Sequence, residues 1–167
     1  MLIESIEIKK NKRDIEKYMA KKTPLMSRVT QFNKFSNVIE LRYVEMKILD
    51  YEIISKVKNG ISFKNKKDKN NIMMMVNTYD GKVESIESIP KTIKKYIVKS
   101  NINKSYINEE ILINSVKNQL IVYLTKTKNI NEISKMEISK INIINTKSIY
   151  KPYWIINFNG KTVLIEA

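Results

Sequence analysis

The chain has 167 residues, with 31 lysines and arginines against 17 aspartates and glutamates, so its net charge is +14. It contains no cysteine and no histidine, which excludes disulfides, thiol nucleophiles, imidazole acid–base chemistry and the common zinc sites. Its three glycines, Gly60, Gly81 and Gly160, are too far apart to form a phosphate-binding loop. We therefore expect no catalytic residue, no metal and no cofactor.

The first predicted elements are a short helix and a stretch of strand. Residues 9–22 are predicted to form a helix, since Ile15, Tyr18 and Met19 recur at helical spacing. Residues 38–57 alternate apolar and polar residues, which is typical of a half-buried strand, but the alternation slips near Val44 and again near Leu49. Two strands joined near residues 48–50, or one long bent strand, would both satisfy this pattern.

A loop and a hairpin are predicted next. Residues 64–71 are rich in lysine and asparagine, and we expect them to form a loop. Residues 72–79, which include three consecutive methionines, are apolar enough for a buried central strand. Asp80–Gly81 is typical of a two-residue type I′ turn, with residues 82–87 returning as the partner strand. A less regular segment with some helical pattern follows Pro90.

The clearest helix is predicted over residues 108–125. Asn108 is a good N-cap, and the glutamates that follow it suit the positive end of the helix dipole. The apolar face is predicted to comprise Ile111, Leu112, Val116, Leu120, Tyr123 and Leu124.

The last third of the chain is predicted to be β-structure. Residues 136–145 and 150–158 are two strand-like runs, and Asn159–Gly160 is a second type I′ signal. We expect residues 161–166 to pair with Tyr153–Phe158 and to be well ordered.

These elements predict an α+β fold, with an antiparallel sheet of roughly six or seven strands built from hairpins. One long and one short helix would pack on this sheet. We expect a single domain over residues 1–167, and a weak α-β-β-β duplication would divide it into residues 1–90 and 91–167. No stretch approaches the roughly 18 apolar residues of a transmembrane helix. A cytoplasmic protein is expected, with a trimmed signal or membrane anchor as the alternative.

An aromatic cluster near the C-terminus contains Tyr150, Tyr153 and Trp154. Aromatic residues dominate interface hot spots, so the cluster could anchor a partner, but the core face of a strand is the favoured interpretation. We favour a buried Trp154 beside a partly exposed tyrosine edge. Tyr150 and Tyr153 are accordingly the candidate partner-binding residues.

Two lysine-rich patches are candidates for contacts to anions or nucleic acid. The first consists of Lys64, Lys66, Lys67 and Lys69, and the second of Lys9, Lys10, Lys12 and Arg13. Phosphate-binding proteins usually rely on arginine, whose planar group binds an oxyanion at two points. Only three arginines occur here, and abundant lysine, isoleucine and asparagine indicate an AT-rich genome. A solvated lysine surface is therefore the favoured interpretation.

The leading functional hypothesis is a non-catalytic protein-interaction or accessory module from an AT-rich bacterium or one of its mobile elements. The partner is then another protein. The alternative is a sequence-independent nucleic-acid-binding protein that uses the lysine patches, with weak and non-specific binding. A third hypothesis is a peripheral protein at the membrane surface, where the same lysines would meet anionic lipid.

Overall fold

A computed structural model describes residues 1–22, 39–57, 66–103, 105, 107–127, 136–158 and 161–167. Within these ranges the chain has an α+β fold, with eight strands in a mixed, mostly antiparallel sheet and two α-helices. The chain divides into two compact units. The first unit comprises residues 1–45, 91–104 and 149–167, and the second comprises residues 46–90 and 105–148. The prediction of a single domain remains a prediction.

Two long strands contribute residues to both units. They are β2 (Ile39–Val57) and β7 (Met136–Phe158). The remaining elements of the first unit are β1 (Leu2–Ser5), α1 (Lys12–Lys22), β5 (Ile93–Tyr96), a 3-10 helix (Lys99–Asn101), β6 (Ile102–Asn103) and β8 (Lys161–Glu166). Here β1 pairs antiparallel with β5 and parallel with β7, and β6 pairs parallel with β2.

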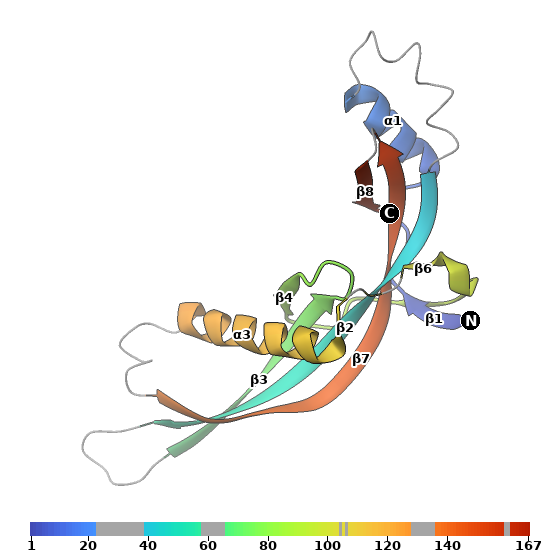
Figure 1. Cartoon of the computed structure of the whole chain (residues 1–167). Helices are drawn as coiled ribbons and strands as arrows, with labels where there is room; N and C mark the ends of the chain where they lie inside the picture. The colour runs from blue at the N-terminus through green and yellow to red at the C-terminus, as the bar shows by residue number, and fades with distance from the viewer. Residues whose placement is uncertain (23–38, 58–65, 104, 106, 128–135, 159–160) are drawn as a thin grey trace. The chain divides into compact units, whose positions relative to one another are not determined.

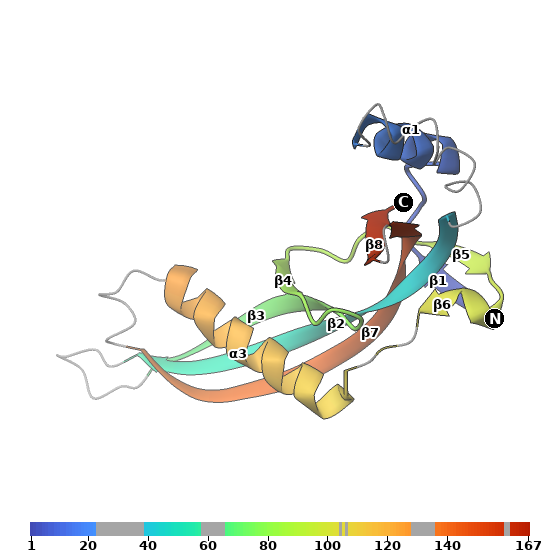
Figure 2. The ribbon, with the colours of Figure 1, turned by 45° about the horizontal axis from the view of Figure 1, so that its top comes forward.

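Helix α1 is capped at its start and buries one narrow stripe. Asn11 and Asp14 cap each other, because each side-chain oxygen accepts a hydrogen bond from the other residue's main-chain N–H at 3.0–3.1 Å. Ile15 and Met19 are buried in a core cluster with residues of β2, β7 and β8. Figure 2 shows α1 near the ends of these strands. Tyr18 is 45% exposed, so it does not join the predicted apolar stripe.

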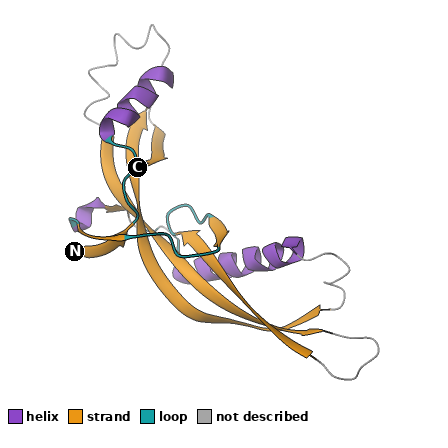
Figure 3. Cartoon of the chain, turned by 180° about the vertical axis from the view of Figure 1, so that it is seen from behind, coloured by secondary structure: helices purple, strands orange, loops and turns teal. Residues whose placement is uncertain are grey.

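The second unit contains the rest of β2 and β7 together with β3 (Lys66–Asn77), β4 (Val83–Ile86) and α3 (Glu109–Thr127). Its strand order is β4-β3-β2-β7. Views from opposite sides show α3 lying on one face of these strands (Figures 1 and 3). The core between helix and sheet is formed by Leu49, Tyr51, Ile53, Met74, Val76, Leu112, Val116, Leu120 and Leu124.

The predicted N-cap of α3 is confirmed, but the buried face of this helix is narrower than predicted. The side-chain oxygen of Asn108 accepts the N–H of Glu110 at 2.9 Å. Leu112, Val116, Leu120 and Leu124 form a buried row with a spacing of four residues. Ile111 is 63% exposed and Tyr123 is 37% exposed, so these two residues lie outside that row.

Strand β2 adopts the single-strand alternative for residues 38–57. At the first slip both Tyr43 and Val44 are buried, and at the second both Ile48 and Leu49 are buried. Consecutive burial means that both faces of the strand are covered at these points. The alternation of apolar and polar residues is therefore interrupted at these two points, although β2 continues as one strand.

The predicted loop at residues 64–71 is wrong where the structure describes it. Lys66–Asn71 belong to β3 and pair antiparallel with Glu52–Val57 of β2. An ion pair of 2.6 Å between Lys69 and Glu52 joins the two strands. Pairing with the preceding strand, β2, therefore stabilises a strand whose own composition favours a loop. Lys64 lies outside the described residues.

The hairpin between β3 and β4 exists, but its connection is longer than the predicted two residues. The N–H of Asn77 bonds to the Lys82 carbonyl at 2.9 Å, so Thr78–Gly81 form the connection. The Asn77 side-chain oxygen accepts the N–H of Tyr79 at 2.9 Å, which stabilises this longer turn. Gly81 has a positive φ of 72°, as a turn glycine requires.

The C-terminal hairpin is confirmed, and the two preceding runs form one strand. Residues 136–158 are continuous in β7, and β8 pairs with it from Tyr153↔Glu166 to Phe158↔Lys161. Asn159 and Gly160 lie outside the described residues. The segment after Pro90 contains strand β5 rather than a helical stretch, because β1 offers it a partner.

Candidate functional site

The aromatic cluster in the first unit differs from the prediction. Tyr153 is 9% exposed and counts as buried, with the Lys151 ammonium 5.8 Å from its ring centre. Trp154 is half-buried, and its indole N–H donates a hydrogen bond to the Lys10 carbonyl at 2.8 Å.

Tyr150 is half-buried. Its burial and the negative charge of Glu45 both raise the pKa of its phenol. Of the two candidate tyrosines, only Tyr150 therefore has the expected partial exposure.

The lysine patches belong to different units. Lys9, Lys10, Lys12 and Arg13 are exposed residues around the start of α1 in the first unit. In the second unit, Lys66 and Lys67 are positions in β3. Lys69 is exposed along the same strand but forms an ion pair with Glu52. The loop expected to present these lysines is thus a strand over its described part.

Sequence reasoning missed a sheet edge in the second unit. Strand β4 pairs only with Met73–Val76 of β3, so no described strand lies beside Lys66–Ile72 on the side away from β2. We call this side of Lys66–Ile72 the open edge of β3, and Figure 1 shows β3 continuing well past β4. The short run at residues 82–87 would have indicated this edge, had residues 66–71 been recognised as strand.

The hydrogen-bonding direction of the open edge follows from the hairpin. Asn77 donates its main-chain N–H to Lys82, the residue opposite it on the β4 side. Alternate residues of an antiparallel strand direct their N–H and C=O groups to the same side. The main-chain groups of Asn71, Lys69 and Lys67 are therefore directed toward the open edge. This edge can accept a further strand.

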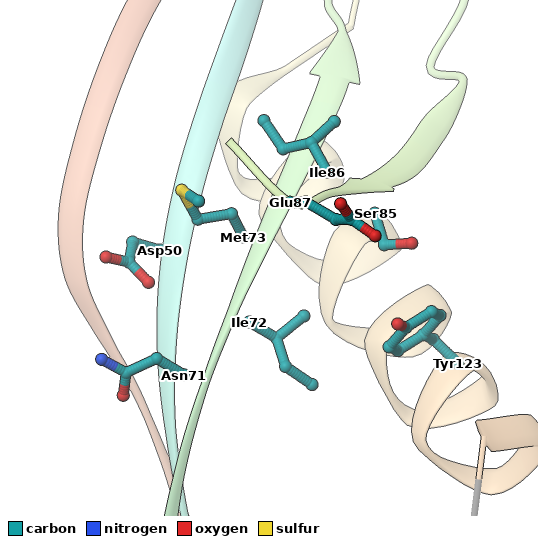
Figure 4. Close-up of a pocket in the computed structure, with 8 residues that line it drawn as sticks. All are labelled: Asp50, Asn71, Ile72, Met73, Ser85, Ile86, Glu87 and Tyr123. Atoms are coloured by element: carbon teal, nitrogen blue, oxygen red, sulfur yellow. The ribbon is translucent and has the colours of Figure 1, made fainter. Parts of the chain in front are cut away.

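A hollow of about 600 Å³ lies where β4 ends and the open edge begins. Its lining residues are Asp50, Asn71, Ile72, Met73, Ser85, Ile86, Glu87 and Tyr123. Figure 4 shows Asp50 and Asn71 on one side of β3, and Ser85, Glu87 and Tyr123 on the other. Side chains from both faces of the sheet therefore line the hollow, next to Ile86, the last residue of β4.

Asp50 gives the hollow a polar group that needs a donor. Its Oδ1 atom is buried and has no hydrogen-bond partner among the described residues. A buried carboxylate oxygen without a donor is costly. Glu87 adds a second carboxylate to the lining.

The charge changes along the open edge away from the hollow. Lys66, Lys67 and Lys69 are strand positions there, with Asp68 as the only acid among Lys66–Ile72. The hydrogen bond from Lys69, together with its positive charge, lowers the pKa of Glu52, and Asn142 and Lys140 of β7 act in the same direction. The hollow therefore has two carboxylates in its lining, whereas Lys69 farther along β3 is paired with Glu52.

The second unit has another unpaired edge on β7. Among the described residues, β1 meets β7 only at Tyr150 and β8 begins its pairing at Tyr153, so no described strand lies beside residues 136–146 on that side. Ile138, Ile143 and Ile144 are 42–48% exposed on this stretch. A strand edge with exposed apolar side chains is a common site of strand addition.

Two further features were sought in the part of the chain that the structure describes. It contains no helix with the length and apolar character needed to cross a membrane. It also contains no group of three or more acidic side chains placed to hold a metal ion. Comparisons with protein-family models, curated proteins and solved structures find no match for this chain.

Proposed function

We propose that this protein is a non-catalytic module that binds another protein by accepting an extended segment at a sheet edge of the second unit. The observation that carries this proposal is the open edge of β3, where Lys66–Ile72 continue past the end of β4 and no described strand lies beside them on that side. An unpaired edge presents a row of main-chain donors and acceptors to any extended segment. Strand addition of this kind is a recurring mode of peptide recognition.

Side chains at both edges favour a protein partner. The hollow beside β3 combines apolar groups such as Ile72 and Met73 with the carboxylates of Asp50 and Glu87. The exposed isoleucines of β7 offer apolar contacts on the other edge. Apolar pockets with a few placed polar groups are what side chains of a bound segment need for specificity. The proposal retains the cytoplasmic setting expected from the sequence.

Selection of a displayed random peptide library against the full-length chain tests this proposal. We expect selected peptides to alternate apolar and polar residues. Their binding should weaken at least tenfold, equivalent to about 1.4 kcal/mol, with Asn71→Pro or Ile143→Lys, which block the two edges. Ile111→Lys, at an exposed position on α3, is the matched control and should leave binding unchanged. Failure to select any peptide, or binding insensitive to both edge variants, would contradict the proposal.

A second candidate function, nucleic-acid binding, is favoured by one observation in the first unit. Tyr96 is 80% exposed, and Lys91, Lys94 and Lys99 nearby in the chain are exposed as well. Exposed aromatics that stack on bases, combined with cations for the phosphates, are typical of single-strand binders. A gel shift with a single-stranded oligonucleotide at low salt tests this candidate. Binding that weakens with salt and with Tyr96→Ala would support it, and no retardation at low salt would exclude it.

A further inference from the structure

We propose that an exposed face of strands β1 and β5 in the first unit docks on an anionic membrane surface. Its apolar side chains enter the bilayer interface, and the lysines beside them meet the headgroups. This partner goes beyond the proposed function, because it belongs to the other unit and uses none of the sheet edges described above. The residues involved also differ from the two lysine patches of the sequence.

The pairing of β1 with β5 places apolar side chains on one exposed face. Leu2 is the Cα partner of Tyr96, so their side chains project to the same face of the sheet. The main-chain nitrogens of Met1 and Ile97 each bond to the other residue's carbonyl oxygen at 2.9–3.0 Å, so the pairing continues beyond Tyr96. Val98 has an extended backbone and therefore lies on the same face as Tyr96.

We call Leu2, Tyr96 and Val98 the Tyr96 face. Their exposed fractions are 50%, 80% and 66%. Figure 2 shows β1 and β5 lying side by side near the N-terminus. Three large apolar side chains are thus presented together by two paired strands.

The opposite face of the same two strands packs inside the first unit. Ile3 and Ser5 of β1 project there and are only 4% and 1% exposed. Lys95 of β5 projects there too, and its ammonium lies 5.8 Å from the centre of the Tyr43 ring. Core formation therefore does not account for the apolar residues of the Tyr96 face.

The charge around the Tyr96 face favours an anionic partner. Residues 91–103 contain four lysines and no acidic residue. Lys94 lies two residues before Tyr96 and therefore on the same face, and Lys99 directly follows Val98. Both lysines are exposed. Each lysine close to an anionic membrane strengthens binding about fivefold, and apolar side chains between the lysines can enter the interface.

The acidic residue of β1 does not cancel this charge. Glu4 is the Cα partner of Lys94 and is half-buried. Its carboxylate accepts a hydrogen bond from the Thr92 hydroxyl at 3.4 Å. Glu4 can offset one lysine at most, so residues 91–103 keep a positive charge.

Contacts with β2 fix the turn that follows β5. The guanidinium of Arg42 in β2 donates a hydrogen bond to the Ser100 carbonyl in the 3-10 helix. Directly after this helix, β6 pairs in parallel with β2. Val98 and Lys99 are therefore held in place before a partner binds, which lowers the entropy cost of association.

The aliphatic members of the face favour lipid over nucleic acid. Tyr96 can stack on a base, as in the second candidate function, but Leu2 and Val98 add no aromatic ring to such a platform. Aliphatic side chains beside a tyrosine suit the boundary between headgroups and acyl chains, where the phenol hydroxyl stays hydrated. We therefore assign the Tyr96 face to a bilayer with anionic headgroups.

Flotation of the full-length chain with lipid vesicles is the first test. We expect binding to phosphatidylcholine vesicles in which a third of the lipid is phosphatidylglycerol. Binding should be at least fivefold weaker to vesicles of phosphatidylcholine alone, and at least fivefold weaker when salt is raised from about 0.1 M to about 1 M. Equal binding to neutral and anionic vesicles, or no binding to either, would overturn the inference.

Apolar variants separate insertion from the general attraction of a chain with a net charge of +14. The triple variant Leu2→Ser, Tyr96→Ser and Val98→Ser keeps every charge, so a loss of binding measures apolar insertion alone. We expect this loss to be at least tenfold. The matched control is a triple variant of exposed α3 residues, Ile111→Ser, Ile121→Ser and Val122→Ser. The control should bind within about threefold of the unaltered protein, and equal losses in the two triple variants would overturn the inference.

Lysine variants test the headgroup contacts. Lys94→Gln combined with Lys99→Gln should weaken binding to the anionic vesicles at least tenfold, since two contacts of about fivefold each are lost. Lys117→Gln, at an exposed position on α3, is the control for loss of charge and should have less than a threefold effect. If each lysine of the pair had only the effect of Lys117, the attraction would be general and the inference would be overturned.

The variant Tyr96→Trp in a Trp154→Phe background reports insertion directly, because Trp154 is the only native tryptophan. Its emission should shift to the blue on anionic vesicles, and lipids brominated on their acyl chains should quench it. This readout holds even if the triple serine variant fails to fold. Bound protein with neither a shift nor quenching would overturn the inserted geometry.

A single-stranded oligonucleotide at the same phosphate concentration decides between the two classes of partner. Tighter binding of the oligonucleotide than of anionic vesicles, with loss of that binding in Tyr96→Ala, would overturn the lipid assignment. Vesicle binding that persists in the presence of the oligonucleotide would support it. Peptide binding at the edges of β3 and β7 is measured separately, so failure of the lipid assignment leaves the proposed function intact.

Discussion

The indole nitrogen of Trp154 lies 2.8 Å from the main-chain carbonyl oxygen of Lys10 and donates a hydrogen bond to it. Trp154 also packs against the core cluster that contains Ile15 and Ile156. Trp154→Phe keeps an aromatic ring but removes the donor, so we expect it to lower the free energy of unfolding by about 0.5–1.5 kcal/mol. Trp154→Ala also loses the packing and should cost about 2–3 kcal/mol, less than for a fully buried tryptophan.

Urea-induced unfolding followed by circular dichroism measures both changes. If Trp154→Phe had the same free energy of unfolding as the unaltered protein, the hydrogen bond from Trp154 to Lys10 would not contribute to stability. A cost of Trp154→Ala no larger than that of Trp154→Phe would contradict the packing contribution.

Gly81 is constrained both by its backbone and by a neighbour. Its φ is +72°, and a Cβ atom added there would lie 3.0 Å from Cδ1 of Ile107. Gly81→Ala should therefore lower the free energy of unfolding by about 1–2 kcal/mol, and Gly81→Val by more. In an Ile107→Val background the contact is relieved, so the additional cost of Gly81→Ala should shrink to the backbone part. An unchanged additional cost in thermal or urea unfolding would show that the contact with Ile107 does not matter.

The parts of the fold that could be predicted are those specified by local sequence. Asn108 caps α3 through its own side chain, and the four-residue spacing of Leu112, Val116, Leu120 and Leu124 identifies the buried face. The C-terminal hairpin was predictable for the same reason, because its strands are adjacent in the chain. Such features need no knowledge of distant residues.

The parts that could not be predicted depend on partner strands that the composition of the segment does not reveal. Lys66–Asn71 form a strand because β2 pairs with them, although their composition favours a loop. Strands β1 and β5 are short and stabilise each other across most of the chain, from Leu2↔Tyr96 to Ser5↔Ile93. The open edge of β3 escaped prediction because it is visible only when the length of β3 is known.

The ion pair between Glu52 and Lys69 makes stability depend on pH in the acidic range. Their charged atoms are 2.6 Å apart, and the hydrogen bond from Lys69 lowers the pKa of Glu52. A carboxyl with a lowered folded-state pKa contributes stability above its unfolded pKa, and this contribution is lost as the pH falls through the folded-state value. The unaltered protein should therefore lose its advantage over Lys69→Gln between about pH 5 and pH 3.

Urea unfolding of both proteins across this range measures the difference. Lys94→Gln is the matched control, since it removes an exposed lysine from the first unit. A stability difference between the unaltered protein and Lys69→Gln that does not change with pH would contradict the role of the pair.

Tyr51 provides a test of the core of the second unit. Its side chain is only 2% exposed, and its hydroxyl has no hydrogen-bond partner among the described residues. A buried polar group without a partner costs about 1–3 kcal/mol, so Tyr51→Phe should leave the free energy of unfolding unchanged or raise it by up to about 1 kcal/mol. Leu120→Ala in the same core should instead lower it by about 2–5 kcal/mol.

The titration of Tyr51 gives the same variant a second readout. Burial raises the pKa of its phenol, so the folded state holds this proton to higher pH than the unfolded state does. The contribution to stability is complete below the unfolded pKa and is lost as the pH rises through the folded-state value. The stability of the unaltered protein should therefore fall relative to Tyr51→Phe above about pH 10, in urea unfolding at alkaline pH. A cost of Tyr51→Phe above about 1 kcal/mol at neutral pH would instead mean that the hydroxyl has a partner worth more than the cost of its burial.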